Sequence, residues 1–78
     1  MKLQLIVSTM FQDDLSLVDK MKISSEAIII NQCNKNQRFE FFHNNNRITW
    51  INTSERGLSN SRNMGLKNAS GDICVLAD

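Results

Sequence analysis

Residues 27–30 read Ala-Ile-Ile-Ile, and this short run decides the fold. It is apolar at every position, whereas a strand with one face in water alternates apolar and polar residues. Continuous apolar, β-branched runs are typical of strands that are covered on both faces in a parallel sheet. Three further runs, Leu3–Val7, Ile48–Ile51 and Ile73–Ala77, predict three more strands.

A helix is expected between the first two strands. It should begin at Asp13 and Asp14, because their carboxylates can accept hydrogen bonds from free backbone amides and complement the helix dipole. It should end near Lys20 and Lys22, which suit the opposite end of the dipole. Its apolar residues recur at helical spacing: Leu15, Val18 and Met21.

A second helical period begins after Gly57. One stripe of this segment contains Leu58, Arg62, Gly65, Leu66 and Ala69. Residues 69–72 then end the helix and lead into the last strand. Gly57 fits a backbone turn before the helix, and Gly65 fits a close approach of the helix to the sheet.

The segment between Ile30 and Ile48 is rich in asparagine and contains a cluster of phenylalanines. We expect a short strand at Arg38–Phe42 that turns through Asn44–Asn46 into Ile48–Asn52. The aromatic side chains could belong to the core or form an exposed docking patch, and the core is favoured. The aromatic residues in question are Phe39, Phe41 and Phe42.

The order of these elements predicts an α/β fold: a Rossmann-like, mostly parallel sheet of about four strands with flanking helices and a short hairpin-like insert. Seventy-eight residues allow one domain at most. The chain stops at Asp78, directly after a strand, although an α/β sheet needs helices on both faces. We therefore expect residues 1–78 to be a single partial domain of a longer protein.

Charge and cysteine usage narrow the function classes. Nine Lys and Arg against eight Asp and Glu give a net charge of +1, and the basic residues are scattered, so nucleic acid and anionic membranes are not expected partners. The first apolar run is broken by Ser8 and Thr9 and is too short for a membrane span. We expect Cys33 and Cys74 to be reduced core thiols, which suits a cytoplasmic protein.

Candidate binding residues lie after the predicted strands, because ligands of open α/β sheets bind outside the carboxyl ends of the strands. The alternative is that these residues are polar only because loops are hydrated. The residues at these ends are Ser8, Thr9, Met10, Asn31, Gln32, residues 52–55 and Asp78.

Arg62 lies on the apolar stripe of the second helix, between Leu58 and Leu66. Its guanidinium must therefore reach water along the helix or meet an acceptor such as a phosphate, a base or the carboxylate of Asp78. No glycine-rich dinucleotide fingerprint or phosphate loop occurs in the sequence. His43, the one histidine, is expected to be a surface turn residue rather than a catalytic base.

The stretch at residues 55–78, ERGLSNSRNMGLKNASGDICVLAD, resembles the family-two glycosyltransferases. In that family a G-x-S-x-x-R-N-x-G motif, a helix and an A-x-G-[DE] motif lead into an apolar strand that ends in D-x-D. Residues 3–12 are a weaker match to the first strand of the family and its Thr-containing turn. All 78 residues align with the N-terminal half of the family.

The resemblance implies a GT-A fold and the transfer of a sugar, with inversion, from a nucleotide-diphosphate donor to an acceptor hydroxyl on a saccharide, lipid or protein. It implies a divalent cation, Mg²⁺ or Mn²⁺, on the diphosphate, with Asp78 as the first Asp of D-x-D and as metal ligand. Thr9 and its neighbours would line the base pocket, and Arg62 would hold the nucleotide. The implied nucleotide-binding set is Ser8, Thr9, Met10, Asn31, Gln32, Arg62 and Asp78.

The sequence departs from the family in two places. The family usually has an aspartate after the second strand, where this chain has Asn31 and Gln32, so the identity of the donor nucleotide stays open. The aromatic insert replaces the helix that the family has between the second and third strands. The general base would lie in the C-terminal half of the enzyme, so the 78 residues alone are not expected to turn over.

The resemblance implies an enzyme that is cytoplasmic or held at the cytoplasmic face of a membrane. The alternative from another class is a non-catalytic α/β regulatory or interaction module similar to a phosphorylatable receiver. A receiver has an acidic pair after its first strand and an acceptor Asp after its third. Ser8-Thr9 and Asn52-Thr53 occupy those places here.

Overall fold

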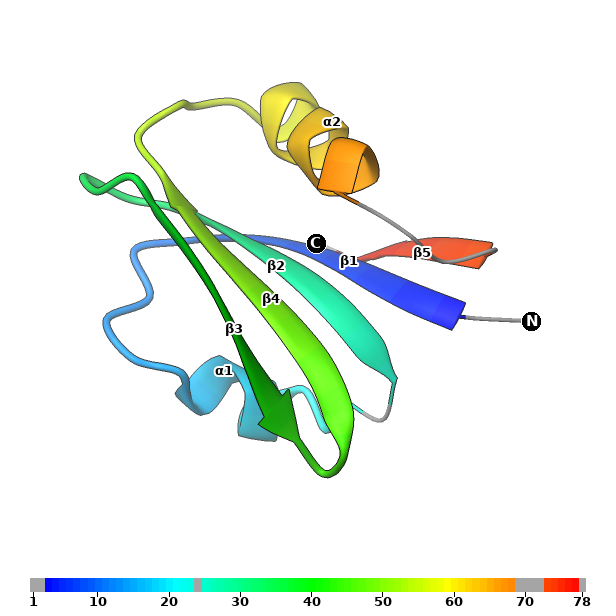
Figure 1. Cartoon of the computed structure of the whole chain (residues 1–78). Coiled ribbons are helices and arrows are strands. Elements are labelled where there is room, and N and C mark those ends of the chain that lie inside the picture. Colours follow the sequence, from blue (N-terminus) through cyan, green and yellow to red (C-terminus); the bar gives the residue numbers. More distant parts are fainter. Residues whose placement is uncertain (1–2, 24, 69–72, 78) are drawn as a thin grey trace.

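The computed structural model describes residues 3–23, 25–68 and 73–77. Figure 1 shows a small α/β domain in which two short helices flank a mostly parallel sheet. In chain order the elements are β1 (Leu3–Met10), α1 (Ser16–Lys20), β2 (Glu26–Gln32), β3 (Gln37–His43), β4 (Asn46–Thr53), α2 (Leu58–Asn68) and β5 (Ile73–Ala77). The predicted order of strands and helices is confirmed.

Within the described residues, the sheet has five strands in the order β3-β4-β2-β1-β5. β1 pairs in parallel with both β2 and β5, β2 pairs in parallel with β4, and β3 pairs antiparallel with β4. The predicted hairpin-like insert therefore joins the sheet as an edge strand. After β4 the chain crosses β2 and β1 to place β5 on the far side of β1 (Figure 1).

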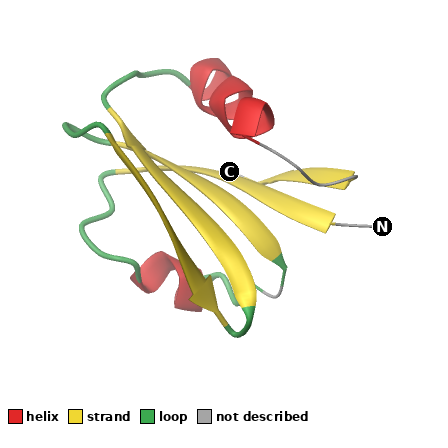
Figure 2. Ribbon diagram, viewed as in Figure 1, coloured by secondary structure: helices red, strands yellow, loops and turns green. Residues whose placement is uncertain are grey.

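The two helices cover opposite faces of the sheet (Figure 2). On the α1 face, Val18 packs into a cluster built around Ile29 and Trp50. On the α2 face, Met64 packs against Ile28 and Ile30. The run at residues 27–30 is fully buried, because successive residues of one strand point to opposite faces and both faces are covered.

Helix α1 is shorter than predicted, because it begins at Ser16 rather than at Asp13 and Asp14. The residues before the helix stay attached to the carboxyl end of β2: the Phe11 N–H donates to the Gln32 carbonyl. Phe11 also has a φ of 53°, which is incompatible with a helix. The expected helix start at the aspartates was therefore wrong by one turn.

The predicted hairpin is confirmed. β3 and β4 join through Asn44 and Asn45, whose φ values of 49° and 65° are those of a type I′ turn, in which asparagine is favoured. Phe39 and Phe41 pack on the core as expected. Phe42 is 75% exposed, so the core prediction was wrong for this residue, which points to the opposite face from Phe41.

Both glycine predictions are confirmed. Gly57 has a φ of 104°, a conformation that a residue with a side chain rarely adopts, in the turn before α2. A methyl group at Gly65 would collide with the Ile6 side chain, so this glycine lets α2 approach β1 closely. Cys33 is only partly buried, which corrects its assignment to the core, and Cys74 lies in β5.

Candidate functional site

A pocket of about 270 Å³ lies at the carboxyl ends of β1 and β2, beside the start of α2. Four of the predicted binding residues meet there, together with two residues from the loop before α2 and one residue of α2 itself. The lining residues are Ser8, Thr9, Met10, Gln32, Arg56, Gly57 and Ser61. The ends of β1 and β2 and the start of α2 thus meet at one place, and we call this space the α2-side pocket.

The wall of the α2-side pocket is held by two polar contacts. The Ser8 and Ser61 hydroxyls lie 2.6 Å apart, a hydrogen bond that joins the end of β1 to the first turns of α2. The Gln32 side-chain amide donates to the Gly57 carbonyl at 2.9 Å. Ser61 is 1% exposed and Gln32 5% exposed, so both contacts lie inside the protein, where a lost partner is costly.

Asn31 faces the other side of the sheet from Gln32. Its side-chain carbonyl accepts from the Gln12 N–H, and its amide donates to the Gln12 carbonyl and to Asn52 Oδ1. Asn52 Oδ1 also accepts from the Trp50 indole N–H at 2.9 Å. The structure therefore separates Asn31 from the α2-side pocket and places it in a network that fixes the loop after β1.

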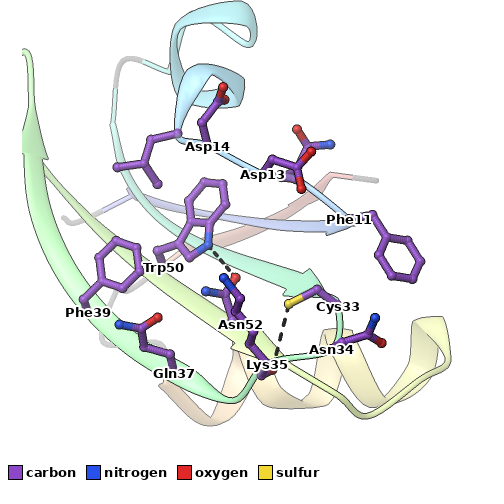
Figure 3. Close-up of a pocket in the computed structure, with 12 residues that line it drawn as sticks. Phe11, Asp13, Asp14, Cys33, Asn34, Lys35, Gln37, Phe39, Trp50 and Asn52 are labelled. Carbon is purple, nitrogen blue, oxygen red and sulfur yellow. Dashed lines mark hydrogen bonds between the residues drawn. The ribbon is translucent and has the colours of Figure 1, made fainter.

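A second pocket, of about 420 Å³, lies on the α1 face of the sheet (Figure 3). Trp50 and Phe39 stand at its inner side, and Asp13 and Asp14 come from the loop before α1 (Figure 3). Hydrogen bonds from the side chain and backbone of Ser16 hold the pKa of Asp14 below its ordinary value. We call this space the α1-side pocket.

Arg56 is a residue of this region that the sequence did not single out. One of its terminal nitrogens donates to the carbonyls of Cys33 and Ser54, and the other donates to Asn34 Oδ1. The guanidinium also lies 5.3 Å from the centre of the Phe11 ring, within the range of a cation–π contact. Arg56 thus connects the loops after β1, β2 and β4.

The loop after β4 is fixed by hydrogen bonds within itself and to the loop after β2. The Ser54 N–H donates to Asn36 Oδ1, and the Glu55 N–H donates to the Thr53 hydroxyl. In the loop after β1, Gln12 Nε2 donates to the hydroxyl of Thr9, a residue of β1 itself. Of the predicted strand-end residues, Thr53 and Glu55 are thus partners of each other, as are Asn31 and Asn52.

Of two further predicted site residues, the structure describes one by its backbone alone and does not describe the other. The backbone of Arg62 lies in α2, one residue after Ser61, whereas Asp78 lies outside the described residues. In the described part of the chain, no three His, Cys, Asp or Glu side chains gather in a way that could hold a metal ion. This finding does not cover Asp78, the predicted metal ligand, which lies outside the described residues.

His43 ends β3 beside the hairpin turn, with its Nε2 3.4 Å from Asp19 Oδ1. It lies away from both pockets, in agreement with its expected place near a surface turn. In the residues that the structure describes, no helix has the length and apolar character needed to cross a membrane.

The chain was compared with models of protein families, with curated proteins and with solved structures, and none of them matches it.

Proposed function

We propose that this chain is the donor-binding half of a GT-A glycosyltransferase of family two, and that the α2-side pocket receives the nucleotide of a nucleotide-sugar. The observation that carries the proposal is the Ser8–Ser61 hydrogen bond of 2.6 Å. It holds the G-x-S-x-x-R-N-x-G motif, which resembles that of the family, against the end of β1. The motif and the strand ends thus form one site.

The sheet topology supports a binding site at the end of β1, the strand that also lines the α2-side pocket. From β1 the chain proceeds outward to β2 and β4, and it then returns to the other side of β1 as β5. Such a reversal leaves a crevice at the carboxyl ends of the two strands that flank it, and nucleotides bind there in open α/β sheets. The Rossmann-like assignment rests on this strand order. Ser8 and Met10 lie at that end of β1, and Asp78 directly follows β5.

The chemistry of the pocket suits a nucleotide. The side-chain NH₂ of Gln32 donates one hydrogen to the Gly57 carbonyl. Its second N–H and its oxygen would be the groups that this side chain offers to the edge of a base. Arg62 is the next residue after Ser61 and would supply a fork of N–H donors to phosphate or base. The two glycines give the turn and the close packing that bring this helix to the strand ends.

Asp78 would begin the D-x-D motif and, with residues beyond it, hold Mg²⁺ or Mn²⁺. Such a cation neutralises the charge that develops on a departing nucleoside diphosphate. The general base and the acceptor site belong to the rest of the proposed enzyme. The acceptor would be the hydroxyl of a saccharide, lipid or protein.

A thermal-shift screen of the full-length protein tests the proposal. UDP-glucose, GDP-mannose and dTDP-glucose are each added with Mn²⁺ or Mg²⁺, and the nucleoside monophosphates serve as controls. A ligand at about 100 times its Kd stabilises the folded state by about 2.7 kcal/mol, which gives a clear rise in Tm. No shift with any nucleotide-sugar, together with phosphate incorporation from acetyl phosphate, would favour the receiver-like module instead.

A further inference from the structure

The outer edge of β3 is a regular row of backbone groups. β3 is the last strand on its side of the sheet in the described part of the chain (Figure 1). It pairs with β4 at every position from Gln37 to His43, without a bulge, and it contains no proline. Of the means by which proteins protect a sheet edge, β3 lacks bulges, prolines and a very short length, and it has charged residues in Arg38 and Glu40.

The hairpin turn determines which residues of β3 face outward. In a two-residue turn the residue before the turn accepts a hydrogen bond from the residue after it, so His43 directs its backbone groups toward β4. Because this direction alternates along an antiparallel strand, the backbone groups of Arg38, Glu40 and Phe42 point away from β4. In the residues that the structure describes, no hydrogen bond reaches these outward groups.

Two of these outward residues have opposite charges and already pair within the hairpin: Arg38 Nη1 lies 3.4 Å from Glu40 Oε1, and Glu40 Oε2 lies 3.7 Å from Arg47 Nε. The exposed fractions of the Arg38 and Glu40 side chains are 52% and 39%. Both side chains point to the same side of the sheet as α2, but α2 does not extend over β3. An antiparallel second copy of β3, related by a two-fold axis through Phe39, places Arg38 opposite Glu40 of the second copy, and Glu40 opposite its Arg38. Opposite charges in such pairs stabilise a sheet. An axis through Glu40 would instead oppose two carboxylates.

The other face of β3 is aromatic and suits the same register. The Phe39 ring is stacked on Trp50, with centroids 6.4 Å apart, and its centroid lies 6.1 Å from that of Phe41. Both phenylalanines are only partly buried. With the axis at Phe39, this residue meets its own copy at a pair without mutual hydrogen bonds, where facing side chains are closest. Aromatic pairs of this kind also stabilise a sheet.

We propose that the β3 edge binds a second copy of this chain, so that two sheets join through antiparallel β3 strands with Phe39 on the two-fold axis. The charge pairs select this register, and the outward backbone groups and the aromatic pair are compatible with it. A contact made by one strand from each copy is small, so the dimer is weak and depends on concentration. This proposal does not rest on the proposed sugar transfer.

Sedimentation equilibrium of the full-length protein, from low to high micromolar concentration, tests the proposal. We expect the wild type to approach twice the monomer mass at the upper end. Arg38→Glu and Glu40→Arg each place like charges across both pairs, so each variant should remain monomeric. An equimolar mixture of the two restores opposite charges across both pairs and should sediment as a dimer.

Lys67→Glu is the matched control for Arg38→Glu, because it makes the same change of charge on α2, away from β3, and it should associate like the wild type. The mixture also separates lost pairing from lost folding, since an unfolded variant would not regain association. A wild type that stays monomeric, single variants that associate like the wild type, or a mixture that stays monomeric would each overturn the proposal.

Discussion

The Ser61 hydroxyl of α2 lies 2.6 Å from the Ser8 hydroxyl at the end of β1. This is a contact between residues 53 positions apart, and Ser61 is buried. It fixes where the helix begins relative to the strand ends. The α2-side pocket therefore depends on a hydrogen bond that involves no ligand.

Ser61→Ala removes this partner. We expect a loss of about 1 kcal/mol of unfolding free energy, because Ser8 is only partly buried and can turn to water. Urea denaturation followed by circular dichroism measures it. Ser61→Thr keeps the hydroxyl but adds a methyl group at this buried position, so its loss of stability reports crowding rather than loss of the hydrogen bond. If the alanine variant is as stable as the wild type, the hydrogen bond does not hold α2 in place.

Gly65→Ala places a methyl group against the Ile6 side chain. Overpacking of this kind costs about 1–3 kcal/mol, which outweighs the better helix propensity of alanine. Ile6→Leu removes the branch methyl that the new group would meet. The double variant should therefore lose less stability than the sum of the two single losses. Strict additivity would show that the close approach is not there.

Asn31→Asp keeps an acceptor for the Gln12 N–H but replaces the amide donor by an oxygen that faces the Gln12 carbonyl and Asn52 Oδ1. We expect a loss of more than about 2 kcal/mol at neutral pH, because one oxygen of the buried carboxylate then faces two acceptors and has no donor. Burial and the facing oxygens raise the pKa of the new carboxyl in the folded state. The loss should therefore shrink as the pH falls below that raised pKa.

Urea denaturation at neutral and acidic pH measures this effect. Asn34→Asp serves as the control, since Asn34 is exposed and its side-chain oxygen already accepts from Arg56. An Asn31→Asp variant with wild-type stability at neutral pH would contradict the network.

The pKa of Asp14 should lie below its ordinary value, because the Ser16 side chain and backbone donate to its carboxylate. A lowered folded-state pKa adds stability above the unfolded pKa, and this stability is lost as the pH falls through the folded value. Ser16→Ala should raise the pKa toward its ordinary value, since the backbone donor alone remains. NMR titration of the carboxyl carbon measures both, and identical titration curves would exclude the side-chain contact.

The apolar runs and the asparagine turn were sufficient to predict the strands. Continuous β-branched stretches favour buried strands over other elements, and neighbouring asparagines tolerate the positive φ angles of a hairpin turn. The length of α1 could not be predicted, since the Phe11 N–H bonds to Gln32, a contact between different elements. Tertiary hydrogen bonds of this kind override the local preference of Asp13 and Asp14 for a helix start.

The site was predicted as one group of residues, whereas the structure divides it between two faces. Asn31 and Gln32 are neighbours on one strand, and neighbouring side chains point to opposite faces. The same alternation separates Phe41 from Phe42. This part of the outcome was accessible from the sequence. The contacts of Arg56 with three loops were not, because they depend on how the loops meet.

The most direct test of the proposed donor site is calorimetric titration of the full-length protein with the nucleotide-sugar that gives the largest thermal shift. We expect Arg62→Ala to weaken binding by more than about tenfold. Lys67→Ala, which removes a positive charge farther along α2, should leave the affinity unchanged. Equal affinities for Arg62→Ala and the wild type would contradict the account.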